Sequence, residues 1–241
     1  MKKLLIALLF APLASWASEE GYRLDRAPID PTDLVSLQAG ARTFVNYCMG
    51  CHGAEYMRYN RLTDLGLTEQ QIKDNLMFTG EKVGETMKVA MTAKQGKAWF
   101  GAAPPDLSVI ARARGADWLY TYLRTFYRDP KTTSGWNNLV FPNVGMPHVL
   151  WTLQGENALK EVKTEEGGHE KVEYQLTELS KGSQNTVQYD TTVRDLVNFL
   201  VYVGEPAATS RVRIGIVALF VLLILFALSY ALKKEYWKDV K

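Results

Sequence analysis

Both cysteines of the chain stand in one short run, Cys48-Met49-Gly50-Cys51, and His52 follows at once. Cys-x-x-Cys-His is the spacing at which proteins attach a c-type haem. The two thiols bond to the vinyl groups on one edge of the porphyrin, and the adjacent imidazole reaches the iron. Because the run occurs once, the sequence predicts one covalently bound haem c. Cys48 and Cys51 are its expected attachment points, and His52 is an expected axial ligand of the iron.

Three other uses of the cysteines fit the sequence less well. A zinc site needs four ligands, and the remaining histidines, His148 and His169, form no second paired motif. A thioredoxin-like redox pair belongs to a βαβ context, which the flanking residues do not supply. A disulfide across so tight a loop would be strained.

The N-terminus has the pattern of a secretory signal peptide. Lys2 and Lys3 precede an apolar run over residues 4–13 that is too short to span a bilayer, and Ser15 and Ala17 place small residues at a cleavage site. We expect residues 1–17 to be a signal peptide and the mature chain to start near Ser18. The alternative is an uncleaved N-terminal anchor.

A second apolar run near the C-terminus predicts a membrane anchor. Residues 214–232 carry no charge, and at ~1.5 Å per residue they extend about 28 Å, close to the ~30 Å hydrocarbon core. A buried core helix would show a polar face, and this run shows none. We expect a transmembrane helix over residues 211–232 and a cytoplasmic tail over 233–241, because four lysines follow the run and two arginines precede it.

Residues 18–210 are therefore expected to form one domain on the periplasmic side of a bacterial-type cytoplasmic (inner) membrane. This segment holds 20 Lys and Arg against 24 Asp and Glu, which gives no case for nucleic acid and a mild one for a basic protein partner. Helical spacing predicts one helix over 32–47, with Thr32 as its N-cap, and a last helix of the domain capped by Asp190. Alternation around Gly167-Gly168 predicts an acidic β-hairpin over 161–179, either solvated or a docking surface.

An electron carrier benefits from a second axial ligand that keeps small molecules off the iron. Met146 stands between Pro142 and Pro147 in a rigid, non-helical segment that can hold a sulfur at constant geometry. It is the first candidate for the sixth ligand. His148 is its rival and Met91 the third.

Further motifs follow the haem run in a fixed order. They are Tyr56-Met57-Arg58-Tyr59-Asn60-Arg61-Leu62, Ala103-Pro104-Pro105-Asp106-Leu107-Ser108, Ala113-Arg114, Gly135-Trp136-Asn137-Asn138, Phe141-Pro142 and Gly145-Met146-Pro147, ahead of the single C-terminal anchor. From Tyr22 onward the chain resembles the cytochrome c1 family, the haem subunits of the cytochrome bc1 complex (ubiquinol–cytochrome c oxidoreductase).

The resemblance implies an all-α, class I cytochrome c-like haem domain with loop and β-hairpin insertions, plus one C-terminal transmembrane helix. It implies an electron-carrier subunit that is not an enzyme by itself. Such a subunit takes electrons from a Rieske iron–sulfur protein and passes them to a cytochrome c, with cytochrome b as a further partner. Met146 matches the family's axial methionine. Arg114 matches an arginine that pairs with a haem propionate, with Arg112 as fallback, and Pro105 matches a proline against the haem.

The chain departs from some members of the family in having no disulfide to brace its loops. Both cysteines are used by the haem, so no disulfide remains for the loops, and we expect the loop before Met146 to be held by packing through Trp136 and Phe141. Three other functions stay open on the sequence: an independent anchored cytochrome that feeds an oxidase, a haem enzyme such as a peroxidase, and a haem-free docking or assembly subunit.

Overall fold

The computed structural model describes residues 22–166 and 169–239, so the predicted signal peptide over 1–17 lies outside the described residues. The helices are α2 (Leu34–Thr43), α3 (Glu69–Asn75), α4 (Ala93–Phe100), α5 (Ile110–Arg114), α6 (Ala116–Arg124), α7 (Trp151–Gln154), α8 (Thr186–Gly204) and α9 (Ala208–Tyr236), with a π-helical turn η1 (Phe44–Cys48) and a 3-10 helix η2 (Tyr59–Leu65).

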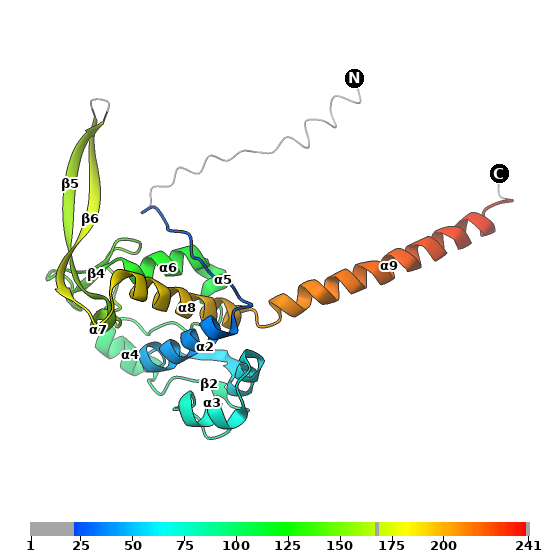
Figure 1. Cartoon of the computed structure of the whole chain (residues 1–241), viewed down its shortest axis with the longest axis horizontal. Coiled ribbons are helices and arrows are strands. Elements are labelled where there is room, and N and C mark those ends of the chain that lie inside the picture. Colours follow the sequence, from blue (N-terminus) through cyan, green and yellow to red (C-terminus); the bar gives the residue numbers. More distant parts are fainter. Residues whose placement is uncertain (1–21, 167–168, 240–241) are drawn as a thin grey trace.

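Helices α2 and α8 cross at the centre of the domain (Figure 1). Helix α2 begins after Asp33, whose carboxylate accepts from two backbone N–H groups of the first turn, as an N-cap does. The expected start at Thr32 was one residue early. Helix α8 starts at Thr186 with a capping box between its N-cap Asn185 and Gln188, so the expected cap at Asp190 was five residues late.

The crossing depends on Gly40, which brings the two backbones into close contact. A Cβ atom at this position would lie 2.0 Å from the carbonyl oxygen of Asp195 and 2.6 Å from the Cβ of Phe199. One turn later the ring of Phe44 packs against that of Phe199, with centroids 5.7 Å apart. The end of α2, which leads into the cysteine run, is thereby fixed on α8.

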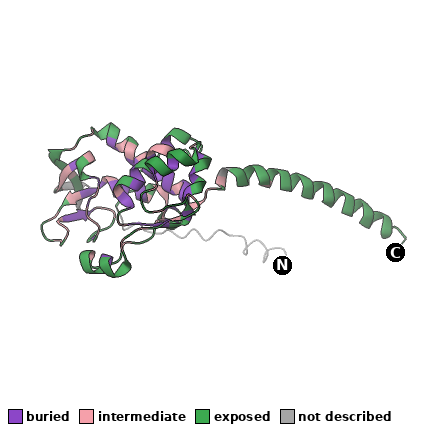
Figure 2. Cartoon of the chain, turned by 90° about the horizontal axis from the view of Figure 1, so that it is seen from below, coloured by how far each residue is buried: buried purple, intermediate pink, exposed green. Residues whose placement is uncertain are grey.

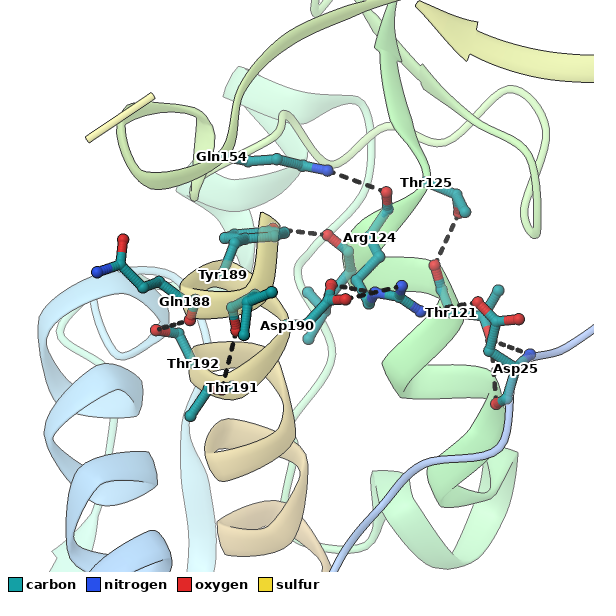
Figure 3. A network of polar contacts seen from close by, with 12 residues as sticks. Asp25, Thr121, Arg124, Thr125, Gln154, Gln188, Tyr189, Asp190, Thr191 and Thr192 are labelled. Atoms are coloured by element: carbon teal, nitrogen blue, oxygen red, sulfur yellow. Dashed lines mark hydrogen bonds and ion pairs between the residues drawn. The ribbon is translucent and has the colours of Figure 1, made fainter. Parts of the chain in front are cut away.

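A charged cluster joins α6, α8 and the N-terminal segment (Figure 3). Arg124 donates to both carboxylate oxygens of Asp190, at 2.6 and 3.2 Å, and to Asp25 at 2.7 Å. Its guanidinium also lies 4.5 Å from the centre of the Tyr120 ring. The side chains of Arg124 and Asp190 are only 22% and 30% exposed, so their pair is shielded from water more than a surface ion pair is, whereas Asp25 is 58% exposed.

We expect Arg124→Gln to lower the free energy of unfolding by about 2 kcal/mol, because the substitution leaves two carboxylates without their cation. Urea unfolding of the purified chain measures this. The matched control is Arg61→Gln, whose ion pair with Asp64 is 47% and 40% exposed and should contribute less than about 1 kcal/mol. An equal decrease in the free energy of unfolding in both variants would show that the Arg124 cluster contributes no more to stability than an exposed ion pair.

Two small sheets accompany the helices. Strands β1 (Ala54–Arg58) and β2 (Thr86–Met87) form one pair, and β3 (Phe126–Arg128), β4 (Trp136–Asn138), β5 (Gly155–Glu166) and β6 (His169–Lys181) form a sheet in the order β4-β3-β5-β6. The fold is therefore mostly helical rather than all-α. The predicted hairpin is confirmed as β5–β6, but it starts at Gly155 and ends at Lys181, beyond the expected 161–179, and projects from the domain (Figure 1).

Helix α9 leaves the domain on another side and is exposed along its length (Figure 2). Within the described residues one helix is long and apolar enough to cross a membrane, with a span over Ser210–Tyr236. None of this span's most apolar window is buried against the rest of the chain. An apolar helix without a protein partner suggests a single-pass membrane anchor, slightly longer than the predicted 211–232.

Candidate haem site

The cysteine run forms a tight turn at the end of α2 and η1. The backbone N–H groups of Cys51 and His52 both donate to the carbonyl oxygen of Cys48, at 3.0 and 2.8 Å. Both thiols are free, Cys48 buried and Cys51 half-buried. Burial, with a smaller contribution from Cys51, raises the pKa of the Cys48 thiol to about 12. Redox-active thiols have lowered pKa values, so this environment disfavours a thioredoxin-like pair.

The imidazole of His52 is buried and held by one hydrogen bond. Its Nδ1 lies 2.7 Å from the carbonyl oxygen of Pro105, and since a carbonyl only accepts, Nδ1 carries the hydrogen. Nε2 then keeps its lone pair, which is the form of imidazole that binds a metal ion. Burial is the main cause that lowers the pKa of His52, which favours this neutral form. Pro105 thus contributes through its carbonyl group.

The segment after Pro105 is pinned to the segment after His52. The N–H of Leu107 donates to the carbonyl oxygen of Gly53 at 2.8 Å, and the carboxylate of Asp106 accepts from the N–H of Glu55 at 2.8 Å. Asp106 was part of a sequence motif, but its role in this hydrogen bonding was not predicted. An Asp that follows two prolines is typical of a side chain that hydrogen-bonds nearby backbone, and that was the available signal.

Met146 is half-buried and accepts a hydrogen bond. The hydroxyl of Tyr122 donates to its Sδ at 3.4 Å, and the Tyr122 ring stacks on Trp118 with centroids 4.7 Å apart. Burial raises the pKa of Tyr122 well above its ordinary value, so the hydroxyl stays a donor. No sequence signal pointed to the contact between Tyr122 and the sulfur of Met146.

We expect Tyr122→Phe to lower the midpoint potential of the bound haem by on the order of 40 mV. A hydrogen bond withdraws electron density from the sulfur, which favours Fe(II), and its net value of about 1 kcal/mol corresponds to that shift for one electron. An optical redox titration measures it. Tyr120→Phe is the control, because Tyr120 lies on the same helix over Arg124. A similar shift in both variants would contradict the role of Tyr122.

The loop before Met146 is braced chiefly by two buried asparagines. The Oδ1 of Asn138 accepts from the N–H groups of residues 140 and 141, at 2.9 and 3.1 Å, and the Oδ1 of Asn137 accepts from that of Asn143 at 2.8 Å. Asn143 has a φ of +61°, a left-handed conformation that asparagine tolerates better than most residues. These hydrogen bonds hold the backbone without a disulfide.

The expected packing brace is only half right. Trp136 is 4% exposed and belongs to the core, whereas Phe141 remains 44% exposed. A Trp buries a large apolar area wherever it meets the core, whereas the ring of Phe141 packs edge-on against Trp118 with centroids 6.3 Å apart and keeps its other side at the surface. The side-chain amides of Asn137 and Asn138 hold the loop by hydrogen bonds, in addition to the packing expected from Trp136 and Phe141.

His148, the rival ligand, lies in the core. Its ring is 2% exposed, stacks on Phe126 at 4.9 Å between centroids and meets Trp136 edge-on at 5.2 Å. Burial lowers the pKa of His148 to about 4, so the ring is neutral at physiological pH. This aromatic enclosure favours Met146 over His148 as the candidate ligand.

Arg114 lies on the same aromatic cluster as Met146. Its guanidinium is 5.1 Å from the centre of the Trp118 ring and 5.8 Å from that of Phe141. In the part of the chain that the structure describes, no carboxylate pairs with Arg114, whereas the fallback Arg112 lies 3.6 Å from Glu205. An unpaired guanidinium remains able to bind a carboxylate from a ligand.

The predicted residues thus fall into two groups. Cys48, Cys51, His52 and Pro105 form the first, and Met146 and Arg114 share an aromatic cluster in the second. The donor set consists of two free thiols, an imidazole with an available Nε2, a thioether and an unpaired guanidinium. These are the groups that a covalent haem requires: two vinyl partners, a nitrogen and a sulfur ligand, and a cation for a propionate.

Comparison with known proteins points the same way. The sequence model of the cytochrome C1 family matches residues 25–240. The chain is 50% identical over 240 residues to a protein of Nitrosomonas europaea named ammonia monooxygenase gamma subunit, covering 100% of this chain and 98% of that protein. It is 49% identical over 245 residues to the cytochrome c1 of Allochromatium vinosum, covering 100% of both chains, and 27% identical over 241 residues to that of Rhodospirillum rubrum, covering 87% and 83%.

Proposed function

Because this chain belongs to the cytochrome c1 family, and is thus an electron carrier that works as a subunit of a complex, we propose that it is the haem subunit of a quinol:cytochrome c oxidoreductase. The observation that carries the proposal is the 49% identity to a cytochrome c1 over the full length of both chains. The cysteine run supports it, since family membership implies a c-type haem and the spacing of Cys48 and Cys51 fits one.

The proposed haem site uses the residues described above. Cys48 and Cys51 would attach the porphyrin, His52 and Met146 would bind the iron, and Arg114 would pair with a propionate. Pro105 lies beside His52 and orients it. The domain around them has the class I cytochrome c-like arrangement, in which the helix before the cysteine run crosses the last helix of the domain.

The protein's contribution is to hold these groups still. The haem, when bound, supplies an iron that takes up and releases one electron. The Pro105 carbonyl fixes the His52 ring and leaves Nε2 free to bind. The Asn137 and Asn138 hydrogen bonds fix the loop of Met146, and Tyr122 orients its sulfur. Rigid ligands favour the same coordination in both oxidation states, so little reorganisation accompanies electron transfer.

The proposed partners are those that the family resemblance implies, and the proposed topology is the one that the sequence pattern predicts. The subunit takes electrons from a Rieske iron–sulfur protein, passes them to a cytochrome c, and assembles with cytochrome b. Residues 1–17 are removed as a signal peptide, and residues 18–210 lie on the periplasmic side. Residues 211–232 span the cytoplasmic membrane, and 233–241 remain in the cytoplasm. The apolar exposed helix α9 supports the single span, and the flanking Lys and Arg support its orientation.

A second candidate is suggested by the relative named ammonia monooxygenase gamma subunit, which is 50% identical over the whole chain. On this alternative the same electron-carrier domain serves an ammonia-oxidising complex. The predicted haem site would be the same, because it depends on residues within this chain. The two candidates therefore differ in the partner subunits and in the reaction of the complex.

Purification of the tagged chain from its native membranes tests the proposal. We expect a pyridine haemochrome spectrum of haem c, co-purified b-type haem and iron–sulfur protein, and ubiquinol-dependent reduction of cytochrome c. Activity of the co-purified complex with ammonia would support the second candidate. Haem c without b-type haem would instead support an independent anchored cytochrome, and absence of haem would support an assembly subunit.

A further inference from the structure

A cavity of about 720 Å³ opens where the haem domain joins α9. Its walls come from α2, η2, α5, the end of α8 and the first turn of α9. The residues used below are Leu34, Arg61, Asp64, Arg112, Glu205, Pro206, Ala207 and Ala208. The cavity takes no part in the haem site described above, and its volume falls in the range of small-molecule binding sites.

The position of the cavity along α9 relates it to the membrane. Ala208 and Ser210 line it, and the uncharged run begins at Ile214. At ~1.5 Å per residue, Ser210 lies about 6 Å and Ala208 about 9 Å along the helix before that run. The polar layer of one leaflet is roughly 5–8 Å thick. If residues 211–232 span the bilayer as proposed above, the cavity opens at the level of the outer lipid headgroups.

The rim of the cavity is positively charged. Arg61 pairs with Asp64, but Arg112 and Arg211 share the single carboxylate of Glu205. Arg112 is the weaker partner, at 3.6 Å, and its side chain is 61% exposed. Arg211 lies outside the lining but pairs with Glu205, so three guanidinium groups at or beside the cavity face two carboxylates, a local excess of one positive charge.

Leu34, Pro206, Ala207 and Ala208 supply apolar lining to the same cavity. A guanidinium rim binds phosphate through paired N–H groups, while an apolar wall continuous with a membrane helix suits glycerol and the first carbons of acyl chains. Juxtamembrane arginines contribute about 1 kcal/mol each toward anionic lipid. The guanidinium groups and the apolar lining together favour a phospholipid with an anionic headgroup.

We propose that this cavity binds the headgroup of an anionic phospholipid from the outer leaflet. Arg112, assisted by Arg61, contacts the phosphate. The apolar lining residues Leu34, Pro206, Ala207 and Ala208 cover the glycerol. The proposal rests on α9 being the membrane anchor. A lipid bound here stabilises the orientation of the haem domain relative to the bilayer, because it joins α2, α5 and α9 at their meeting point.

The test uses the full-length, haem-loaded chain in phosphatidylcholine vesicles with and without phosphatidylglycerol. Flotation of the vesicles first tests the anchor. Native mass spectrometry after gentle detergent release then measures phosphatidylglycerol retained per haem. We expect one retained lipid in the unaltered chain and about fivefold weaker retention in Arg112→Gln. Arg213→Gln is the matched control, since it removes one positive charge near the membrane but outside the cavity lining.

A second variant distinguishes binding inside the cavity from a general attraction of positive charge to anionic lipid. Ala208→Phe fills the cavity without altering charge, and we expect it to abolish retention while haem content and thermal stability stay unchanged. Equal retention in Arg112→Gln, Arg213→Gln and Ala208→Phe would overturn the proposal even if all float with the vesicles, and would leave another polypeptide as the occupant. Failure of the unaltered chain to float would instead overturn the membrane anchor.

Discussion

Replacement of Met146 with leucine is expected to lower the midpoint potential of the haem by on the order of 0.1–0.3 V, within the roughly 0.8 V range that axial ligands cover. A neutral thioether favours Fe(II), and leucine offers no donor atom. The substitution conserves volume, so the loop held by Asn137 and Asn138 should stay folded. An optical redox titration measures the potential, and the weak long-wavelength band of Met–Fe(III) bonding should vanish.

Loss of the sulfur also opens a coordination position. The reduced Met146→Leu variant is therefore expected to bind carbon monoxide, while the unaltered chain does not. Met91→Leu is the matched control, because it makes the same chemical change at the third candidate and should leave the potential and the band unchanged. An unchanged potential in Met146→Leu would contradict the assignment of Met146 and return His148 or Met91 to consideration.

Replacement of Gly40 with alanine is expected to lower the free energy of unfolding by at least about 3 kcal/mol. The new Cβ would lie 2.0 Å from the Asp195 carbonyl oxygen, which belongs to a helix backbone and cannot rotate away. Helices α2 and α8 would have to separate, and the Phe44–Phe199 contact would loosen with them. Urea unfolding of the haem-loaded chain, followed by far-UV circular dichroism, measures the loss.

The matched control for this substitution is Gly84→Ala. No atom lies within 4 Å of the Cβ position at Gly84, and its φ is not in the left-handed region. Alanine there should change the free energy of unfolding by less than about 1 kcal/mol. A Gly40→Ala variant as stable as Gly84→Ala would show that the helix crossing adjusts without cost.

Several elements could be predicted because their signal is local. The cysteine run and the apolar C-terminal segment each occupy consecutive residues, so spacing and composition suffice to recognise them. The predicted helix over 32–47 and the hairpin appear in the structure with shifted ends, because helix caps and strand ends depend on particular hydrogen bonds. Asp33 and Asn185 supply those caps.

The sequence by itself determined the family, the haem motif and the single apolar helix, since each depends on residue types at fixed spacing. Only the tertiary structure decided that Pro105 holds His52 through its carbonyl, that Tyr122 donates to Met146, and that His148 belongs to the core. These contacts join residues 24 to 53 positions apart or depend on an aromatic enclosure. No local pattern encodes such distances, because they arise only when α2, α6 and α8 pack together.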